Sequence, residues 1–148
     1  MIKLEQFRRE HYKTYEAWFS DEILRKALGN VDDEWLHHVL HDPTGLQLVA
    51  LVQEQLVGVV GLILPSEQSE AVFITDFAIA PQLRRTGLGK RFLDALFRYP
   101  LVRSFKYWRA YVERGNDSAL SFFQKNKWYI MHDETIEDDM IPIALIRP

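Results

Sequence analysis

Apolar and polar residues follow two rhythms along this chain, and the rhythms predict its elements. Alternation at every second position, or a short run of β-branched and aromatic residues, predicts a strand. The first such segment is 2–7, and the one richest in these residues is 71–79, "AVFITDFAI". The remaining strands are expected in a hairpin over 46–65 that turns at "QEQ", at 105–113, and in a last hairpin over 128–136 and 140–147.

Apolar positions three and four residues apart predict the helices. Residues 9–28 have this spacing, but Ser20 and Asp21 in their middle are typical helix N-caps, so we expect two short helices there. A third helix should begin at Asp32 or Asp33 and end before Pro43, because the residue before a proline disfavours the helical conformation. Two longer helices are expected over 87–99 and 116–126, the second capped by Asn116 or Asp117.

The order of these elements predicts the fold class. A strand, short helices, a hairpin and a strand are followed by a glycine loop, and then by helix, strand, helix and two strands. This order is typical of an α/β or α+β domain with a mixed sheet and a helical crossover in its middle. We find no repeat, linker or change of composition, so we expect residues 1–148 to form a single domain.

Composition narrows the function classes. The 148 residues carry a net charge of -3, which argues against a nucleic-acid partner, because such proteins usually present a strongly basic face. The chain has no cysteine, which excludes disulfides, thiolate metal sites and a cysteine nucleophile. The apolar run over 56–65 is too short to cross a bilayer, and the charged start does not resemble a signal peptide. We therefore expect a cytoplasmic protein with no membrane partner.

The histidines do not predict a metal centre. His37 and His41 are four residues apart on an expected helix, the spacing of two zinc ligands. No H-E-x-x-H pattern surrounds them and no third ligand is apparent. We expect no metal.

The stretch "LRRTGLGKRFL", residues 83–93, carries the clearest chemical signal. A dinucleotide fingerprint would need a third glycine where Phe92 stands, and a P-loop would need a glycine at Arg84, so neither fits. What remains is an R-x-x-G-x-G turn that opens a helix. Backbone N–H groups in such a turn converge on an anion, and glycine lets the backbone come close to it. A plain helix start beside solvated arginines is the alternative.

The stretch resembles the pyrophosphate loop of the GCN5-related N-acetyltransferase (GNAT) family, whose motif is Q/R-x-x-G-x-G/A. The preceding "DFAIAPQ" is similar to the family's fourth strand and turn. About thirty residues on, "NDSALSFFQKNKW" resembles the second family motif, N-x-x-A-x-x-F/L-Y-x-x-x-G-F. Together the resemblance spans nearly the whole chain. It implies the acyl-CoA N-acyltransferase fold, a mixed, mostly antiparallel sheet flanked by helices.

The resemblance also implies where acetyl-CoA would bind. The fourth strand's main chain would hold the pantetheine arm and supply an N–H for the oxyanion, the glycine loop would hold the pyrophosphate, and the second motif would contact the cofactor arm. The residues concerned are Phe77, Ala78 and Ile79, then Arg84, Arg85, Thr86, Gly87, Leu88, Gly89 and Lys90, and finally Asn116, Phe122 and Phe123. For Asn116, a plain helix N-cap is the alternative role.

The catalytic groups are less well specified. A primary amine is protonated near neutral pH, so a carboxylate should help to remove its proton. Asp76 on the fourth strand is the first candidate base and Glu113 the second. The family often has a tyrosine where Phe123 stands, whose phenol protonates the leaving thiolate. Here water or another phenol, that of Tyr129, Tyr111 or Tyr107, would have to replace it.

The sequence thus predicts an enzyme that transfers the acetyl group of acetyl-CoA to a primary amine through a tetrahedral intermediate. We expect a small-molecule acceptor, because no segment for docking a peptide is apparent. The alternatives are an acyl-CoA-binding domain without catalysis, which Phe123 favours, and an interaction domain without a cofactor. The last hairpin could offer its edge to a second copy in a homodimer.

Overall fold

The structure, a computed structural model, describes residues 1–132 and 139–148, and its centre is a mixed seven-stranded sheet. The strand order is β1-β2-β3-β4-β5-β7-β6. Among the described strands, β4 and β5 run parallel, and the other neighbours are antiparallel. The strands are β1 (Lys3–Gln6), β2 (Gly45–Val52), β3 (Gln55–Ile63), β4 (Val72–Ile79), β5 (Tyr107–Glu113), β6 (Tyr129–Ile130) and β7 (Met140–Ile146).

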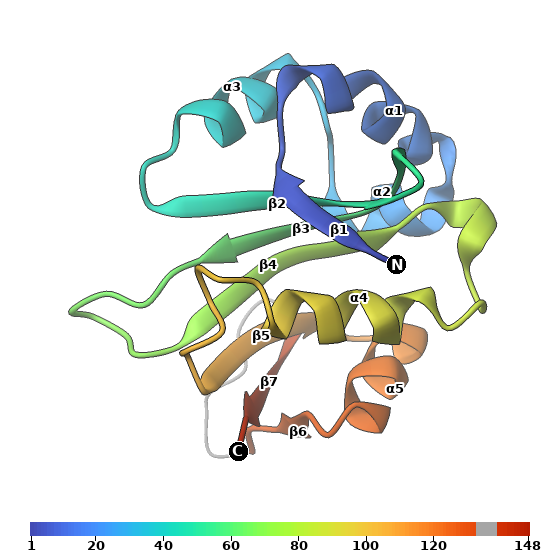
Figure 1. Cartoon of the computed structure of the whole chain (residues 1–148). Helices are drawn as coiled ribbons and strands as arrows, with labels where there is room; N and C mark the ends of the chain where they lie inside the picture. The colour runs from blue at the N-terminus through green and yellow to red at the C-terminus, as the bar shows by residue number, and fades with distance from the viewer. Residues whose placement is uncertain (133–138) are drawn as a thin grey trace.

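Helices cover both faces of the sheet (Figure 1). The short helices α1 (Tyr12–Ala17), α2 (Glu22–Leu28) and α3 (Asp33–His41) lie on one face, and α4 (Leu88–Phe97) and α5 (Asp117–Lys125) lie on the other. Three 3-10 turns, Arg9–His11, Trp18–Ser20 and Pro81–Leu83, join these elements. The predicted mixed sheet with flanking helices is therefore confirmed.

The helix starts show why the chain folds this way locally. The side chain of Asp21 accepts a hydrogen bond from the backbone N–H of Leu24, which separates α2 from the preceding turn as the sequence predicts. Asp32 caps α3 in the same manner, through the N–H of Trp35. The last hairpin is shorter than expected, because β6 contains only Tyr129–Ile130, and residues 133–136 of the predicted strand lie outside the described part.

Each face of the sheet has its own core. The α1–α3 side packs the aromatic side chains of Phe7, Tyr15, Trp18 and Phe19 against β2 and β3. Trp18 is 7% exposed and belongs to this core. The α4–α5 side is larger and centres on Phe92 and Trp108, which are both fully buried.

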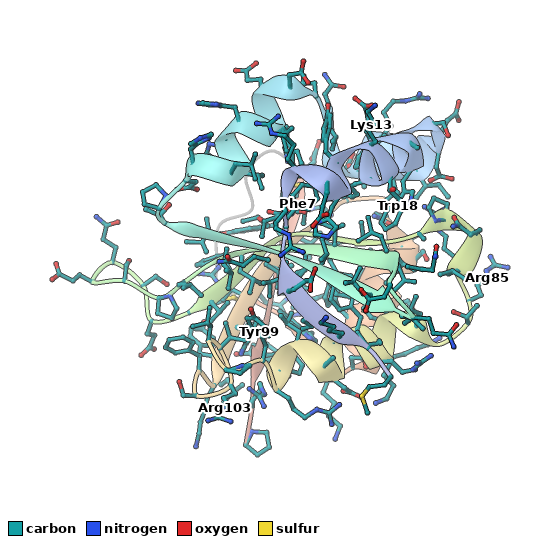
Figure 2. All side chains as sticks on the ribbon, turned by 45° about the horizontal axis from the view of Figure 1, so that its top comes forward. Phe7, Lys13, Trp18, Arg85, Tyr99 and Arg103 are labelled. Atoms are coloured by element: carbon teal, nitrogen blue, oxygen red, sulfur yellow. The ribbon has the colours of Figure 1, made fainter. Side chains whose placement is uncertain are left out.

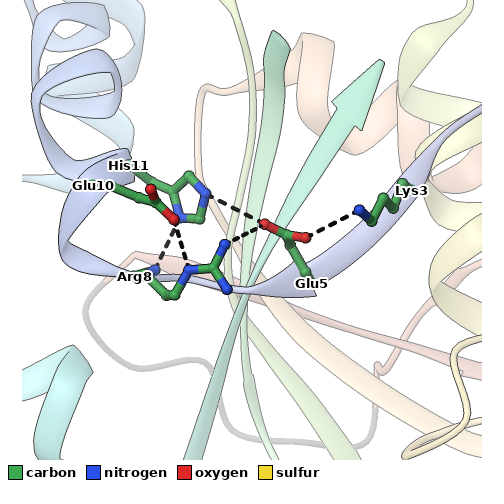
Figure 3. A network of polar contacts seen from close by, with 5 residues as sticks. All are labelled: Lys3, Glu5, Arg8, Glu10 and His11. Atoms are coloured by element: carbon green, nitrogen blue, oxygen red, sulfur yellow. Dashed lines mark hydrogen bonds and ion pairs between the residues drawn. The ribbon is translucent and has the colours of Figure 1, made fainter. Parts of the chain in front are cut away.

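The first strand is tied to the first turn by a surface network (Figure 3). Glu5 accepts from the guanidinium of Arg8 at 3.0 Å and lies 3.6 Å from the ammonium of Lys3. Arg8 also donates to Glu10 at 2.7 Å, and its backbone N–H donates to Nδ1 of His11. These exposed contacts hold the chain where it leaves β1 for α1. No helix in the described ranges is long and apolar enough to span a bilayer.

A β-bulge interrupts β4 in its middle. Gly61 of β3 pairs with Asp76, but the next residue, Leu62, pairs with Ile74, so Thr75 is one residue too many. A single extra residue reverses which face the following side chains point to. As a result Ile74 packs in the α4–α5 core, whereas Asp76 and Ala78 lie on the α1–α3 side.

The two parallel strands stay paired over a short length only. β4 and β5 are in register from Val72 to Ile74, opposite Trp108 to Ala110. Beyond these pairs, the described parts of the two strands continue without pairing with each other. This leaves the second half of β4, which includes Phe77 and Ile79, with β3 as its only strand neighbour.

Candidate active site

Asp76 is held over the centre of the sheet by two side chains. Its Oδ2 accepts a hydrogen bond from Nε2 of Gln47 at 2.9 Å, and its Oδ1 accepts one from the hydroxyl of Thr75 at 2.9 Å. Gln47 lies on β2, two strands away from Asp76. The contact therefore crosses the intervening strand β3.

Gly61 makes this contact possible. It is the residue of β3 that pairs with both Gln47 and Asp76. A Cβ at Gly61 would overlap Oδ1 of Asp76 and would lie 2.6 Å from the hydroxyl of Thr75 and 2.7 Å from the amide oxygen of Gln47. The missing side chain therefore leaves the space in which the three polar groups meet.

Asp76 forms part of the wall of a cavity of about 350 Å³, which we call the Asp76 cavity. The floor of the cavity comes from β2, β3 and β4, and its cover from α2 and α3. Tyr15 and Trp35 supply aromatic surface. The charged or polar side chains that line it are His38, Asp42, Gln47, Thr75 and Asp76.

The two carboxylates of this cavity differ in their electrostatics. Burial raises the pKa of Asp76 above its ordinary value, and the hydrogen bonds from Gln47 and Thr75 only partly oppose this. Hydrogen bonds from the hydroxyl and the backbone N–H of Thr44 lower the pKa of Asp42 instead. A carboxylate with a raised pKa is suited to accept a proton, whereas Asp42 is held as an anion.

The glycine loop has the conformation that an anion site requires. Gly87 has φ of 82°, in the left-handed region, and is the N-cap of α4. Nothing lies within 4 Å of where its Cβ would be. At Gly89 a Cβ would come 2.9 Å from the ring of Phe122, so this glycine allows α4 and α5 to pack closely. The first N–H groups of α4 have no partner within the helix and face the loop.

The basic residues of the loop differ in their availability. Arg84 donates two hydrogen bonds to the carboxylate of Asp21, at 3.0 and 2.7 Å, and so joins the loop to the start of α2. Arg85 is exposed and extends away from the body of the molecule (Figure 2). Lys90 forms an ion pair with Asp94 on α4, and the hydroxyl of Thr86 donates to the carbonyl of Leu83. Arg85 is thus the loop arginine that points into solvent.

The aromatic residues named from the sequence form one group. The Phe77 ring stacks on Phe92 at 4.8 Å and on Phe122 at 5.8 Å, on the α4–α5 side of the sheet. Phe123 is 6% exposed and packs edge-on against Phe122 and Trp128. Leu88 and Ala78 are buried as well, so only their backbones are available to a ligand.

Asn116 acts as an N-cap. Its side-chain oxygen accepts a hydrogen bond from the backbone N–H of Ala119 at 3.2 Å, at the start of α5. The helix-cap role that the sequence left open for Asn116 is therefore present in the structure.

The other candidate catalytic residues lie apart from the cavity. Glu113 ends β5, where it pairs with Met140 of β7. Tyr129 lies on β6 and is 44% exposed. Neither side chain lines the Asp76 cavity.

Sequence reasoning missed four residues that form this site: Tyr15, Asp42, Gln47 and Gly61. Two of them carry a signal that could have been used. Gln47 is a polar residue inside the apolar run "LQLVALV", and Gly61 is a glycine inside a strand, which often marks a close approach. The centroids of the His37 and His41 rings lie 4.2 Å apart with the rings tilted by 30°, and no group of three metal-ligating side chains is found in the described residues.

Comparison with known proteins agrees with the geometry. Residues 4–128 match the model of the acetyltransferase (GNAT) family. Over 99 residues the chain is 26% identical to an L-2,4-diaminobutyric acid acetyltransferase of Marinococcus halophilus, a match that includes 64% of this chain. The match spans 58% of the length of that relative.

Solved structures share the fold at low sequence identity. An acetyltransferase from Thermus thermophilus superposes with a TM-score of 0.82 at 15% identity, over 99% of this chain and 97% of the other. A spermidine N-acetyltransferase from Vibrio cholerae, in complex with CoA and spermine, gives 0.79 at 14% identity over 99% and 95%. The PaiA N-acetyltransferase from Thermoplasma acidophilum, in complex with coenzyme A, gives 0.74 at 16% identity over 99% of both chains.

Proposed function

Since this chain belongs to the acetyltransferase (GNAT) family, whose enzymes are acetyl-CoA-dependent N-acetyltransferases, we propose that it transfers the acetyl group of acetyl-CoA to a primary amine of a small molecule. The observation that carries the proposal is the position of Asp76. Its carboxylate lies in a cavity on one side of β4, while the unpaired edge of the same strand adjoins α4 and its glycine loop. Acceptor and donor would meet at this strand.

The chemistry needs an amine without its proton. An alkylammonium has a pKa of about 10.4 and cannot attack a thioester, so a base has to take the proton. Asp76 is the base in this proposal, directly or through a water molecule. The amine nitrogen then forms a bond to the acetyl carbon, and the C–S bond breaks as the tetrahedral intermediate collapses. A backbone N–H near Phe77 or Ala78 would stabilise the oxyanion.

The leaving thiolate needs little help from the protein. Phe123 cannot donate a proton, and Tyr129 lies on β6, outside the Asp76 cavity. A thiol has an ordinary pKa of about 8.5, so the thiolate can take its proton from water near neutral pH. We therefore assign no general acid to the chain, and Glu113 is assigned no role as a base.

The glycine loop and α4 are the part that fits the diphosphate of acetyl-CoA. The open space at Gly87, the positive φ and the free N–H groups of α4 are suited to an anion. Arg85 and Lys90 would add charge, while Arg84 holds the loop to α2. Asn116, Phe122 and the backbone of Phe77 and Ile79 would contact the rest of the cofactor.

The size of the Asp76 cavity supports a small acceptor. A volume of about 350 Å³ lies at the lower end of the range for small-molecule sites. The relatives named for diaminobutyric acid and spermidine act on small amines by their names, which supports the same class for this chain. We also propose that residues 1–148 form one domain, because a single sheet runs through the chain. Cytoplasmic location and the homodimer remain predictions.

The test is release of the CoA thiol from acetyl-CoA in the presence of a panel of primary amines, with the acetylated product identified by mass. We expect amine-dependent release. Gly87→Asp should abolish it, because the new carboxylate repels the diphosphate. Gly29→Asp is the matched control, since Gly29 also has a positive φ, of 77°, but lies at the end of α2.

The alternative function is acyl-CoA binding without catalysis, which Phe123 favours over an enzyme with a built-in acid. Binding of acetyl-CoA without release of thiol, with every amine of the panel, would establish this alternative and overturn the transferase proposal. Failure to bind acetyl-CoA at all would overturn both.

A further inference from the structure

Carboxylates dominate the ionisable lining of the Asp76 cavity. It contains the carboxylates of Asp42 and Asp76, the imidazole of His38 and the phenol of Tyr15, and no lysine or arginine is among the described residues that line it. The two carboxylates bring two negative charges when both are ionised. Such a lining favours a cationic ligand and disfavours one that brings a carboxylate.

Asp42 is in an unusual place for a stabilising aspartate. It follows α3 directly, as the C-cap, where the helix dipole is negative and a carboxylate is unfavourable. The ionised form is supported nevertheless, because Oδ1 accepts hydrogen bonds from the hydroxyl of Thr44, at 2.7 Å, and from its backbone N–H, at 2.9 Å, which lower the pKa of Asp42. A carboxylate at the negative end of a helix is locally unfavourable. Such departures from local preference, when other contacts compensate for them, are expected at functional positions.

The other oxygen of Asp42 faces Gly45 and His38. Oδ2 lies 3.0 Å from where a Cβ of Gly45 would be, and 3.5 Å from Nε2 of His38. Gly45 therefore leaves room beside this oxygen, as Gly61 does beside Asp76. The carboxylate can still accept hydrogen bonds, since each carboxylate has about four acceptor positions.

The register of the sheet indicates how far apart the two glycines beside these carboxylates lie. Gly45, beside Asp42, pairs with Ile63 of β3, whereas Gly61, beside Asp76, lies two residues away from Ile63 on the same strand. Two residues along β3 amount to about 7 Å, and the step from β2 to β3 adds about 4.8 Å across the sheet, so the two glycines lie roughly 8 to 9 Å apart. The spacing is that of two charged groups joined by a short carbon chain.

We infer that the acceptor is a dication, a short aliphatic α,ω-diamine, with the amine to be acetylated at Asp76 and the second ammonium held by Asp42. This inference rests on the proposed function, and it gives Asp42 a role in specificity. A diamino acid would place its own carboxylate in the same anionic cavity, so it should be a much poorer acceptor than the diamine of equal length.

The experiment compares four acceptors: 1,3-diaminopropane, 1,4-diaminobutane, butylamine and 2,4-diaminobutanoate. All four acceptors are assayed in the same buffer at one pH. We expect kcat/KM for the better diamine to exceed that for butylamine by about tenfold or more, the effect of one charge-assisted contact. The diamino acid should be used no better than butylamine.

Asp42→Asn removes the charge and keeps an oxygen for Thr44. We expect it to raise KM for the diamine by about tenfold more than it raises KM for butylamine. Asp33→Asn is the matched control, since it removes the same charge from an exposed position on α3 that does not line the cavity. This control should leave KM and kcat unchanged for both the diamine and butylamine.

Each result has a separate meaning. Equal use of diamine and butylamine by the wild type, preference for the diamino acid, or an Asp42→Asn effect that is the same for both amines would overturn the diamine inference and leave the transferase proposal standing. Absence of thiol release with all four acceptors and with the wider amine panel would overturn the proposed function itself.

Discussion

Asp76 shares its carboxylate between Gln47 and Thr75 on the wall of the Asp76 cavity. Because burial raises its pKa, the carboxylate takes up a proton more readily than an exposed aspartate would. The same burial makes the ionised form of Asp76 less favourable in the folded protein than in the unfolded chain. The contribution of Asp76 to stability is therefore present at low pH and declines as pH rises through its raised pKa.

Asp76→Asn should lower kcat/KM by about 100-fold or more, the usual size of a general-base effect. The loss should be greatest at low pH, where the amine is almost wholly protonated, and should shrink as pH approaches the pKa of the amine. Steady-state rates as a function of pH check this, with the affinity for acetyl-CoA measured separately. An unchanged pH–rate profile would remove Asp76 from the mechanism.

Gly61→Ala should disable the same group without touching it chemically. The new methyl group would overlap Oδ1 of Asp76, so the carboxylate must move away from Gln47. We expect activity to fall with the affinity for acetyl-CoA retained, and the free energy of unfolding to fall by about 1–3 kcal/mol.

Gly58→Ala provides the comparison. It lies on the same strand but faces α4, where a Cβ would come 2.6 Å from the ring of Phe92. It should destabilise the protein through overpacking alone. If both variants lose activity in proportion to their loss of stability, the contacts of Asp76 with Gln47 and Thr75 beside Gly61 do not contribute to catalysis.

Between elements, the ion pair of Asp21 and Arg84 joins the glycine loop to the start of α2. The Arg84 guanidinium, with help from the N–H groups of the helix, lowers the pKa of Asp21 to about 2. A lowered pKa means that the stabilisation is fully present above the ordinary aspartate pKa of about 3.9. It is lost as pH falls from there towards about 2.

A double-mutant cycle with Asp21→Asn and Arg84→Gln should give a coupling free energy of about 1 kcal/mol at neutral pH, because solvent screens the pair. Chemical denaturation measures it, and acetyl-CoA affinity should fall in both single variants because the loop is released. Asp32→Asn removes the charge from a cap of the same kind, which has no arginine partner among the described residues. It should leave acetyl-CoA affinity unchanged, and an equal loss there would refute the link.

The elements also show which parts of the structure the sequence could predict. Capping and periodicity placed α2, α3, α4 and α5, since Asp21, Asp32 and Asn116 are caps and the apolar spacing follows the buried faces. The bulge at Thr75 was not predicted: the adjacent polar residues Thr75 and Asp76 do interrupt the alternation in "FITDFAI", but a bulge is defined by the pairing of β4 with β3, which this run alone does not give. The partners of Asp76 were missed for the same reason, since Gln47 meets it only through the pairing of three strands.

For the whole molecule, ligand binding should be visible as stability. Acetyl-CoA at about a hundred times its dissociation constant should add roughly 2.7 kcal/mol to the free energy of unfolding. For a domain of this size the midpoint of thermal unfolding should rise by several degrees. ATP and NAD are the controls, and the shift should be specific to acetyl-CoA. No shift at millimolar acetyl-CoA would mean that the glycine turn is only a helix start.

The bulge in β4 has a consequence for how related sequences are aligned. Ahead of Thr75 the odd-numbered residues of β4 face away from α4, and after it the even-numbered ones do. A single gap placed anywhere in this strand would therefore equate a cavity residue of one protein with a core residue of another. The two halves of β4 are therefore best aligned separately. Residues from Asp76 onward are aligned relative to the glycine loop that follows, and residues 71–74 relative to the start of the strand.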